Sequence, residues 1–274
     1  MSVVEFKTYS WMEPTAAEQY HSTISSAGAA FQLVRRDIYL RYLQTFIKPG
    51  RKILDLGCGS GLIAIALSDL GYDIVGCDVS EAMLNRFRTE KGSRQIELRQ
   101  GNAFDIPGAD NEFDAVISRM FIQHFPNWPL ILREKARVTK PGGIIVYDFA
   151  NLEHLHTAEG IELPAAQYPY CTDPADAERY YAACTQADLR KIASKLNLDV
   201  LQIVPHGLLL NNAQFWKSVG ASKVSSFYKR LDEFLENSDV RDFLAFLEEE
   251  FVARLAPQVT YGNIAVLQKI GPAK

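Results

Sequence analysis

Three glycines at alternate positions, Gly57, Gly59 and Gly61, directly follow the mostly apolar residues 53–56 and precede a segment with helical spacing. Glycine has no Cβ, so it adopts positive φ angles readily and lets the backbone come into contact with a ligand. The first turn of the following helix directs unpaired N–H groups toward the same point. A strand, a glycine turn and a helix in this order predict a nucleotide-binding site at one edge of a sheet.

A second apolar strand, expected at residues 73–77, ends in an acidic residue, Asp78. A carboxylate at this strand tip can accept hydrogen bonds from both hydroxyls of a ribose, and Asp78 follows Gly57 by 21 residues, which fits the dinucleotide pattern. The glycine spacing does not fit that pattern, because dinucleotide sites use G-x-G-x-x-G and this turn is D-x-G-x-G-x-G. Ser80 is expected to cap the next helix, with Glu81 in its first turn.

Five short motifs in one unbroken order resemble the class I S-adenosylmethionine-dependent methyltransferases. They are the D-x-G-x-G-x-G turn that begins at Asp55, the acid at Asp78, and the strings Gly101-Asn102-Ala103, Phe113-Asp114-Ala115-Val116 and Lys140-Pro141-Gly142-Gly143. The match covers about residues 50 to 150. It implies S-adenosyl-L-methionine as the cofactor and says little about the substrate.

The alternation of strand-like and helical patterns predicts an α/β fold with a parallel sheet. Strands are expected at residues 51–56, 73–77, 95–99, 113–118, 143–149, 199–204 and 259–270, and helices at 13–47, 60–70, 80–90, 128–138 and 186–196. The resemblance implies a doubly wound, Rossmann-like, mostly parallel seven-stranded sheet with the last strand antiparallel, plus helical lid insertions.

We expect a helical N-terminal cap at residues 1–50, a Rossmann-like cofactor-binding core at 51–207 with 258–274, and a helical insertion at 208–257. Two apolar stripes at helical spacing mark the insertion: Val224, Phe227, Leu231, Phe234 and Leu235, and Val240, Phe243, Leu244, Leu247, Phe251 and Leu255. One interpretation is that both stripes pack onto the core, with the acidic run 248–250 facing solvent. The other, which can hold together with the first, is that the insertion, the cap and the loop 151–185 form a lid over the carboxyl ends of the strands.

Composition is typical of a soluble enzyme. The 274 residues are 47% hydrophobic and 23% charged, enough for one large α/β core. The net charge of −4 and the absence of a Lys/Arg run make a nucleic-acid partner unlikely on electrostatic grounds. No signal-peptide pattern or membrane-length apolar run is present, so we expect a cytoplasmic protein without a membrane partner. The four cysteines form no C-x-x-C pair and are expected to be reduced.

The resemblance assigns cofactor contacts residue by residue. The glycine turn would pass around the methionine portion, Asp55 would orient the turn or meet the amino group, and Asp78 would bind the ribose. Asn102 and Ala103 match the position that hydrogen-bonds the adenine amino group, and Arg119 would contact the cofactor through its backbone carbonyl. The full set of expected cofactor residues is Asp55, Gly57, Cys58, Gly59, Gly61, Asp78, Val79, Met83, Asn102, Ala103, Phe104 and Arg119. Core packing is an equal alternative for Met83 and Phe104.

His124 is the best-placed candidate for a catalytic base, since imidazole titrates near neutral pH and its segment borders the expected pocket. A capping or packing role is the alternative. A metal site at His154, His156, Cys171 and Cys184 is considered, but incidental loop residues explain this set better and no metal is expected. Aromatic residues in the cap and lid segments could stack on an apolar or aromatic substrate: Tyr9, Trp11, Tyr20, Tyr168, Tyr170 and Trp216.

Three functions remain open at this point. The first is methyl transfer to a nitrogen, oxygen or carbon atom of a small molecule by in-line displacement. The second is a methyltransferase or modifier that acts on RNA or protein. The third is a protein that binds the cofactor without methyl transfer. The oligomeric state stays open.

Overall fold

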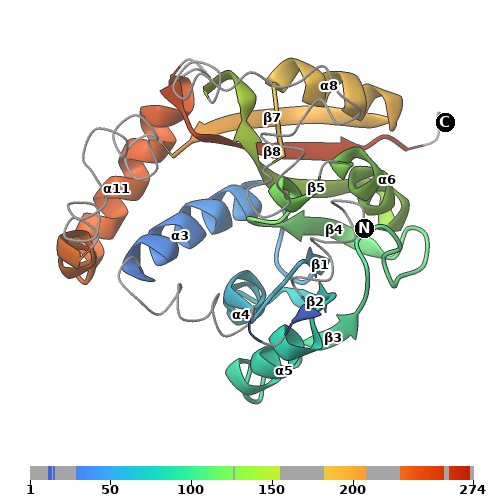
Figure 1. The fold of residues 1–274 in the computed structure, drawn as a ribbon, viewed down its shortest axis with the longest axis horizontal. Coiled ribbons are helices and arrows are strands. Elements are labelled where there is room, and N and C mark those ends of the chain that lie inside the picture. The colour runs from blue at the N-terminus through green and yellow to red at the C-terminus, as the bar shows by residue number, and fades with distance from the viewer. Residues whose placement is uncertain are drawn as a thin grey trace.

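The structure, a computed structural model, describes residues 12–13, 15, 29–125, 127–154, 182–207, 229–255 and 259–271. These residues form one mixed sheet with helices on both faces (Figure 1). The strands lie in the order β3-β2-β1-β4-β5-β8-β7, and β6 pairs with β5 off this path. Within the described residues, no helix has the length and apolar content needed to cross a bilayer.

The strands confirm the expected sheet. Pairs β1–β2, β1–β4, β2–β3 and β4–β5 are parallel, whereas β8 runs antiparallel to both β5 and β7. The two-residue strand β6 adds a parallel pair that the sequence did not predict. The strands are β1 (Lys52–Leu56), β2 (Asp73–Asp78), β3 (Glu97–Gln100), β4 (Phe113–Ser118), β5 (Thr139–Asn151), β6 (Ala183–Cys184), β7 (Leu198–His206) and β8 (Gly262–Lys269).

Most described helices follow the predicted ranges closely, and α3 (Ala29–Phe46) covers the second half of the helix predicted at 13–47, most of whose first half lies outside the described residues. The described helices are α3, α4 (Leu62–Asp69), α5 (Glu81–Glu90), η1 (Ile122–His124), α6 (Trp128–Val138), α8 (Gln186–Lys195), α11 (Ser238–Glu250) and η2 (Val252–Arg254). Ser80 caps α5 as expected, because its hydroxyl accepts a hydrogen bond from the Met83 amide. Thr185 and Asp188 form a capping box at the start of α8.

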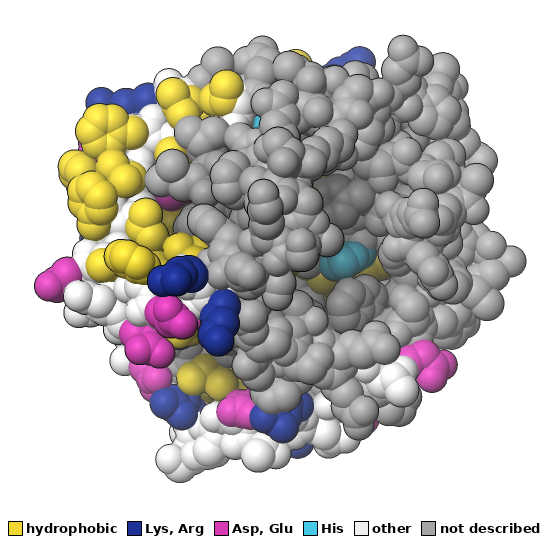
Figure 2. All heavy atoms as spheres, turned by 60° about the vertical axis from the view of Figure 1, so that its left-hand side comes forward, with side chains coloured by type: hydrophobic (Ala, Val, Ile, Leu, Met, Phe, Trp, Pro, Cys, Tyr) yellow, Lys and Arg dark blue, Asp and Glu magenta, His cyan; other side chains and the backbone are white. Residues whose placement is uncertain are grey.

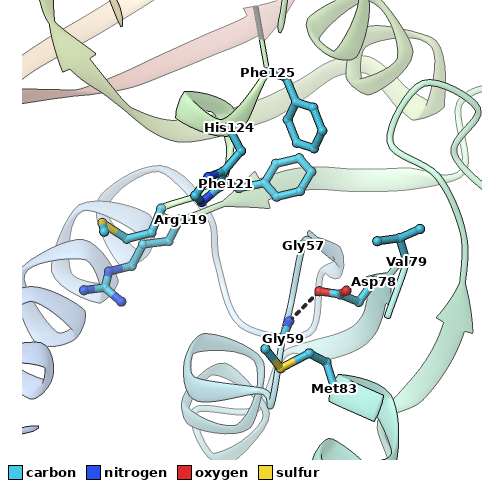
Figure 3. A pocket seen from close by; sticks show the side chains of 10 residues that line it. Gly57, Gly59, Asp78, Val79, Met83, Arg119, Phe121, His124 and Phe125 are labelled. Carbon is cyan, nitrogen blue, oxygen red and sulfur yellow. Dashed lines mark hydrogen bonds between the residues drawn. The ribbon is translucent and has the colours of Figure 1, made fainter. Parts of the chain in front are cut away.

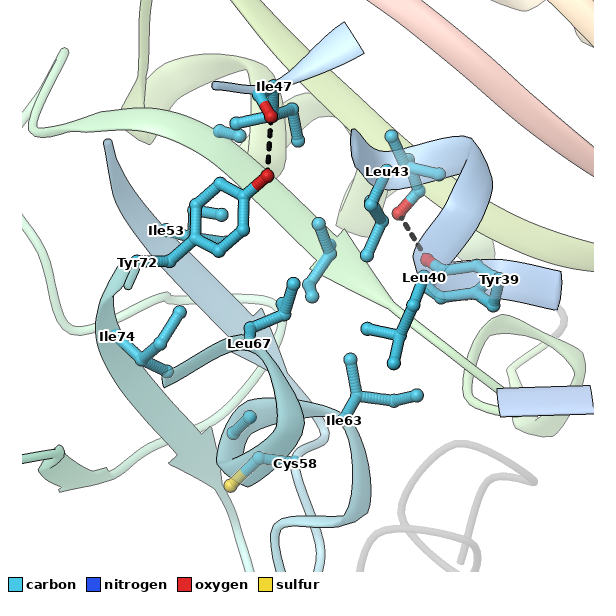
Figure 4. Close-up of a cluster of buried hydrophobic side chains, with 14 of the residues drawn as sticks. Tyr39, Leu40, Leu43, Ile47, Ile53, Cys58, Ile63, Leu67, Tyr72 and Ile74 are labelled. Carbon is cyan, nitrogen blue, oxygen red and sulfur yellow. Dashed lines mark hydrogen bonds between the residues drawn. The ribbon is translucent and has the colours of Figure 1, made fainter. Parts of the chain in front are cut away.

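Side chains alternate between the two faces of the sheet, as β structure requires. On β1, Ile53 joins the core beneath α3, α4 and α5, whereas Leu54 and Leu56 join the core on the opposite face. Tyr39 and Leu43 of α3 belong to the first of these cores, which Figure 4 shows in close-up. The described part of the cap therefore packs directly on the sheet.

Helix α11 packs against α3, and the apolar stripes predict part of this contact: Leu231, Leu235, Val240 and Leu244 join it, whereas Phe234, 65% exposed, does not. Ala245 is buried against Val34 and Ile38 of α3, while Phe243 and Phe251 are each 58% exposed. The stripe prediction is wrong for these two side chains. Successive residues of a helix are rotated by about 100° about its axis, and the side of α11 that faces α3 carries Ala245. Figure 2 turns the left-hand side of Figure 1 toward the viewer. Hydrophobic side chains gather at one edge of the face that it shows.

The acidic run 248–250 is also different from the expectation. Glu248 is only 3% exposed, and its carboxylate accepts a hydrogen bond from the Gly207 amide at 3.1 Å. The prediction of a wholly solvated run is therefore wrong for Glu248. Its position on the inner face of α11 brings it to the end of β7, where a backbone N–H needs an acceptor.

Candidate functional site

The glycine turn between β1 and α4 has the left-handed backbone that the sequence predicted. The φ angles of Gly57, Gly59 and Gly61 are 73°, 53° and 94°. The Gly57 amide donates to the Cys77 carbonyl at 2.8 Å, which ties the turn to the end of β2. A Cβ at Gly57 would lie 2.2 Å from the Phe121 ring, and a Cβ at Gly61 would lie 2.3 Å from the Phe87 ring. Two of the three glycines are thus required by close packing as well as by φ.

Asp78, at the carboxyl end of β2, fastens the turn to the loop before α5. One carboxylate oxygen accepts from the Gly59 amide at 2.9 Å and the other accepts from the Ser80 amide at 2.9 Å. Burial raises the pKa of Asp78, and these amide hydrogen bonds act in the opposite direction. The carboxylate therefore lies at the meeting point of two loops at the carboxyl edge of the sheet.

A cleft of about 570 Å³, counting the part open to solvent, lies beside this carboxylate. Figure 3 shows Asp78, Val79 and Met83 on one side, and Arg119, Phe121 and His124 on the other. The lining residues are Gly57, Gly59, Asp78, Val79, Met83, Arg119, Met120, Phe121, His124 and Phe125. The cleft is thus built by the ends of β1, β2 and β4.

A second chamber of about 280 Å³ adjoins the cleft and includes Asn102 and Ala103. The two chambers share Gly57, Asp78, Val79, Phe121 and Phe125 as lining residues. The Asn102 carboxamide oxygen accepts from the Phe104 amide at 3.0 Å, which fixes the turn after β3. The two chambers therefore adjoin each other, and Asp78 lines both.

Most of the expected cofactor residues border this space, and four do not. Asp55, Cys58, Gly61 and Phe104 line neither chamber. Cys58 is buried in the main core, and the Phe104 ring packs edge-on against Phe125 at 5.5 Å. Contact of any of these residues with a cofactor stays a prediction.

Asp55 lies beneath the turn and is only 3% exposed. A backbone hydrogen bond with Ala64 joins it to the first turn of α4. Burial, together with the negative charge of Asp78, raises the pKa of Asp55 to about 7. A cation bound in the cleft would favour the ionised carboxylate, because the two charges attract across a medium of low polarity.

His124 ends η1 and lines the main cleft, so it lies where a base candidate should. His154 is buried beside Tyr261, with ring centroids 6.3 Å apart. His156, Cys171 and the aromatic residues named for the lid lie outside the described residues. Among the described residues, no group of three or more metal-ligating side chains could hold an ion.

Residues 54–147 match a family model described as a methyltransferase domain. A demethylmenaquinone methyltransferase from Corynebacterium kroppenstedtii is 42% identical over 96 residues, which is 35% of this chain and 40% of that protein. A protein of the same name from Bacillus pumilus is 39% identical over 106 residues, covering 36% of this chain and 45% of the relative. The chain thus spans less than half the length of the curated relatives it matches.

Solved structures resemble a larger part of the chain. A Pyrococcus horikoshii protein has a TM-score of 0.55 at 20% identity and covers 86% of this chain and 89% of its own. The magnesium protoporphyrin IX methyltransferase of Synechocystis, solved with bound S-adenosylhomocysteine, has a TM-score of 0.52 at 14% identity and covers 87% and 82%. Residues 54–147, about a third of the chain, thus match a methyltransferase domain. At these identities the structural likeness shows the fold of the domain and nothing more.

Several residues around the cleft were not predicted from the sequence. Met120, Phe121 and Phe125 line the cleft; the sequence places the segment 118–124 at the expected pocket but assigns roles only to Arg119 and His124 within it. From α3, Gln32 accepts a hydrogen bond from Arg119 at 3.0 Å. Phe121 could have been identified from the sequence by its position close to Arg119 after the end of β4. No sequence feature of Gln32 indicates that it lies near the cleft.

Proposed function

We propose that the protein transfers the methyl group of S-adenosylmethionine to a small-molecule acceptor. The observation that carries this proposal is the pair of adjoining chambers at the glycine turn, both lined by Asp78, within the residues that match a methyltransferase domain. The residues present fit such a cofactor. Asp78 suits a ribose, Gly59 permits close backbone approach, and the adjoining chamber at Asn102 suits a flat ring.

When bound, S-adenosylmethionine supplies a methyl group that is already activated on a sulfonium. The protein then has to hold an acceptor in line, exclude water and offer a base where the acceptor carries a proton. We propose His124 for the last role, because it lines the cleft on the wall opposite Asp78 and Met83. Loss of the low-pH limb of the rate profile in His124→Asn, with cofactor affinity unchanged, would support that role.

The acceptor is proposed as a small molecule of apolar or aromatic character. The support is that the cleft wall facing Asp78 presents Met120, Phe121 and Phe125, and that the matched relatives are named for a quinone substrate. Those relatives match only the cofactor-binding part of this chain, so their substrate is one candidate among several. The net charge of −4 argues against an RNA acceptor.

Transfer of labelled methyl groups tests this function. Purified protein, methyl-labelled S-adenosylmethionine and a panel of demethylquinones, phenols and amines should yield one labelled small molecule whose mass has increased by one methyl group. The Asp78→Ala variant is the matched control and should yield none. Parallel reactions contain cellular RNA or protein in place of the panel, and label that enters only these macromolecules would show that the small-molecule proposal is wrong.

We further propose that the N-terminal cap (residues 1–50) and the insertion (residues 208–257) act as a lid over the cofactor-binding core. The support is that Gln32 and Arg35 of α3 reach Arg119 and Met120 at the cleft, and that α11 packs on the other side of α3. Amide hydrogen exchange in α3 and α11 should slow on addition of S-adenosylhomocysteine, because a bound ligand holds a lid closed. Unchanged exchange in both helices would contradict the lid.

We also propose that the protein lies in the cytoplasm, and cell fractionation would test this location.

A further inference from the structure

Met120, at the tip of β4, has a backbone conformation that its side chain disfavours. Its φ angle is 54°, in the left-handed region that residues with a Cβ rarely adopt. Met120 lines the cleft, as do its two neighbours in sequence, Arg119 and Phe121. Such conformations persist only where surrounding groups hold them in place, and they concentrate at functional sites.

One buried carboxylate holds this residue directly. The Met120 amide donates to a carboxylate oxygen of Asp148 at 2.7 Å, the length of a charge-assisted hydrogen bond. Asp148 is only 6% exposed and comes from β5, the strand next to β4. It interrupts a run of buried apolar residues that includes Ile145 and Phe149, where a carboxylate is costly unless it has partners.

Two further buried groups hold the residue at the end of β4, Ser118. The Tyr39 hydroxyl, from α3, lies 2.8 Å from the Ser118 carbonyl and donates a hydrogen bond to it. The Lys135 ammonium, from α6, donates to the Ser118 hydroxyl at 2.5 Å. Helices on both faces of the sheet and the neighbouring strand thus converge on the same strand tip.

Two arginines near Asp148, Arg119 and Arg35, favour the charged form of its carboxylate, although burial, the larger effect, disfavours it and leaves the pKa raised. Lys135, fully buried, contributes a further attractive interaction with Asp148, although burial lowers the pKa of Lys135 itself to about 7. No apolar side chain of similar size could provide the acceptor that the Met120 amide requires.

We propose that Asp148 is a positioning residue that holds Met120 in its left-handed conformation, so that Arg119, Met120 and Phe121 form the cleft wall that faces Asp78. The carboxylate acts through the backbone of residue 120 and does not itself line the cleft. This inference rests on the proposed function, because it requires the cofactor to bind in that cleft.

Calorimetric titration with S-adenosylhomocysteine tests the proposal in a cycle of four proteins: wild type, Asp148→Ala, Met120→Gly and the double variant. Removal of the acceptor should weaken binding about tenfold in the wild-type background, the effect of losing one hydrogen bond to a charged group. Glycine adopts positive φ without strain. In the Met120→Gly background, Asp148→Ala should therefore weaken binding by less than about threefold, and this coupling between adjacent sites is the signature of positioning.

Equal losses in both backgrounds, or no loss in either, would overturn the inference. If Asp148→Ala does not fold, Asp148→Asn is compared with wild type outside the cycle, because its carboxamide oxygen can still accept a hydrogen bond from the Met120 amide. The affinity of Asp148→Asn for S-adenosylhomocysteine should then be within about threefold of that of wild type. A tenfold loss in Asp148→Asn would also overturn the inference. If the wild type binds no S-adenosylhomocysteine, the proposed function fails, and the same cycle measured by thermal melting still tests whether glycine at position 120 removes the need for Asp148.

Discussion

Replacement of Asp78 by alanine is expected to weaken binding of S-adenosylmethionine and S-adenosylhomocysteine by about 100-fold or more. Two ribose hydroxyls would lose a charged acceptor, at roughly 1.5–3 kcal/mol for each hydrogen bond. The amides of Gly59 and Ser80 would also lose the carboxylate that joins their loops. Isothermal titration calorimetry measures the affinity of each nucleoside.

Asp73→Ala is the matched control for this variant. Asp73 begins the same strand, is exposed, and lies at the opposite edge of the sheet from the cleft. Its loss should leave both affinities within about twofold of wild type, as for most surface substitutions. An Asp78→Ala protein that folds and binds as tightly as wild type would show that the ribose is not held by this carboxylate.

Valine at position 59 is expected to abolish cofactor binding while the fold remains. Gly59 lines the cleft with a φ of 53°, so a β-branched side chain would strain the turn and occupy the approach to the ligand. Circular dichroism and thermal melting report the strain, and calorimetry with S-adenosylhomocysteine reports the loss of binding.

Gly71→Val separates these two effects. Gly71 has a φ of 84°, and a Cβ there would meet no atom within 4 Å, so valine adds backbone strain far from the cleft. Both variants should lose stability to a similar degree, on the order of 1–2 kcal/mol. Only Gly59→Val should lose binding, and normal affinity in that variant would remove Gly59 from the ligand site.

The sheet could be predicted from the sequence because its determinants are local. Apolar runs such as 113–118 define buried strands, and the glycines between Asp55 and Leu62 leave a left-handed turn as the natural connection. Asp78 could be selected as a ligand residue for the same reason, since a strand tip is set by where its apolar run ends.

The supporting contacts of the site could not be predicted, because they depend on how distant elements lie against each other. The hydrogen bond from Met120 to Asp148 joins the ends of two adjacent strands, and nothing near either residue in sequence indicates it. Burial of Glu248 follows from the rotation of α11 against α3, which the apolar stripe misjudged by favouring Phe243 over Ala245. Helical spacing indicates that a face is apolar without indicating how far the partner helix covers it.

The most direct test of the central claim is a titration of the wild-type protein with S-adenosylmethionine, S-adenosylhomocysteine and NAD. Both sulfur nucleosides should bind with dissociation constants between about 1 μM and 1 mM, the range usual for enzyme KM values. NAD should bind far more weakly, because the D-x-G-x-G-x-G turn departs from the dinucleotide spacing. Binding of NAD in preference to both nucleosides, or no binding of either nucleoside at millimolar concentration, would contradict the assignment of this cleft to S-adenosylmethionine.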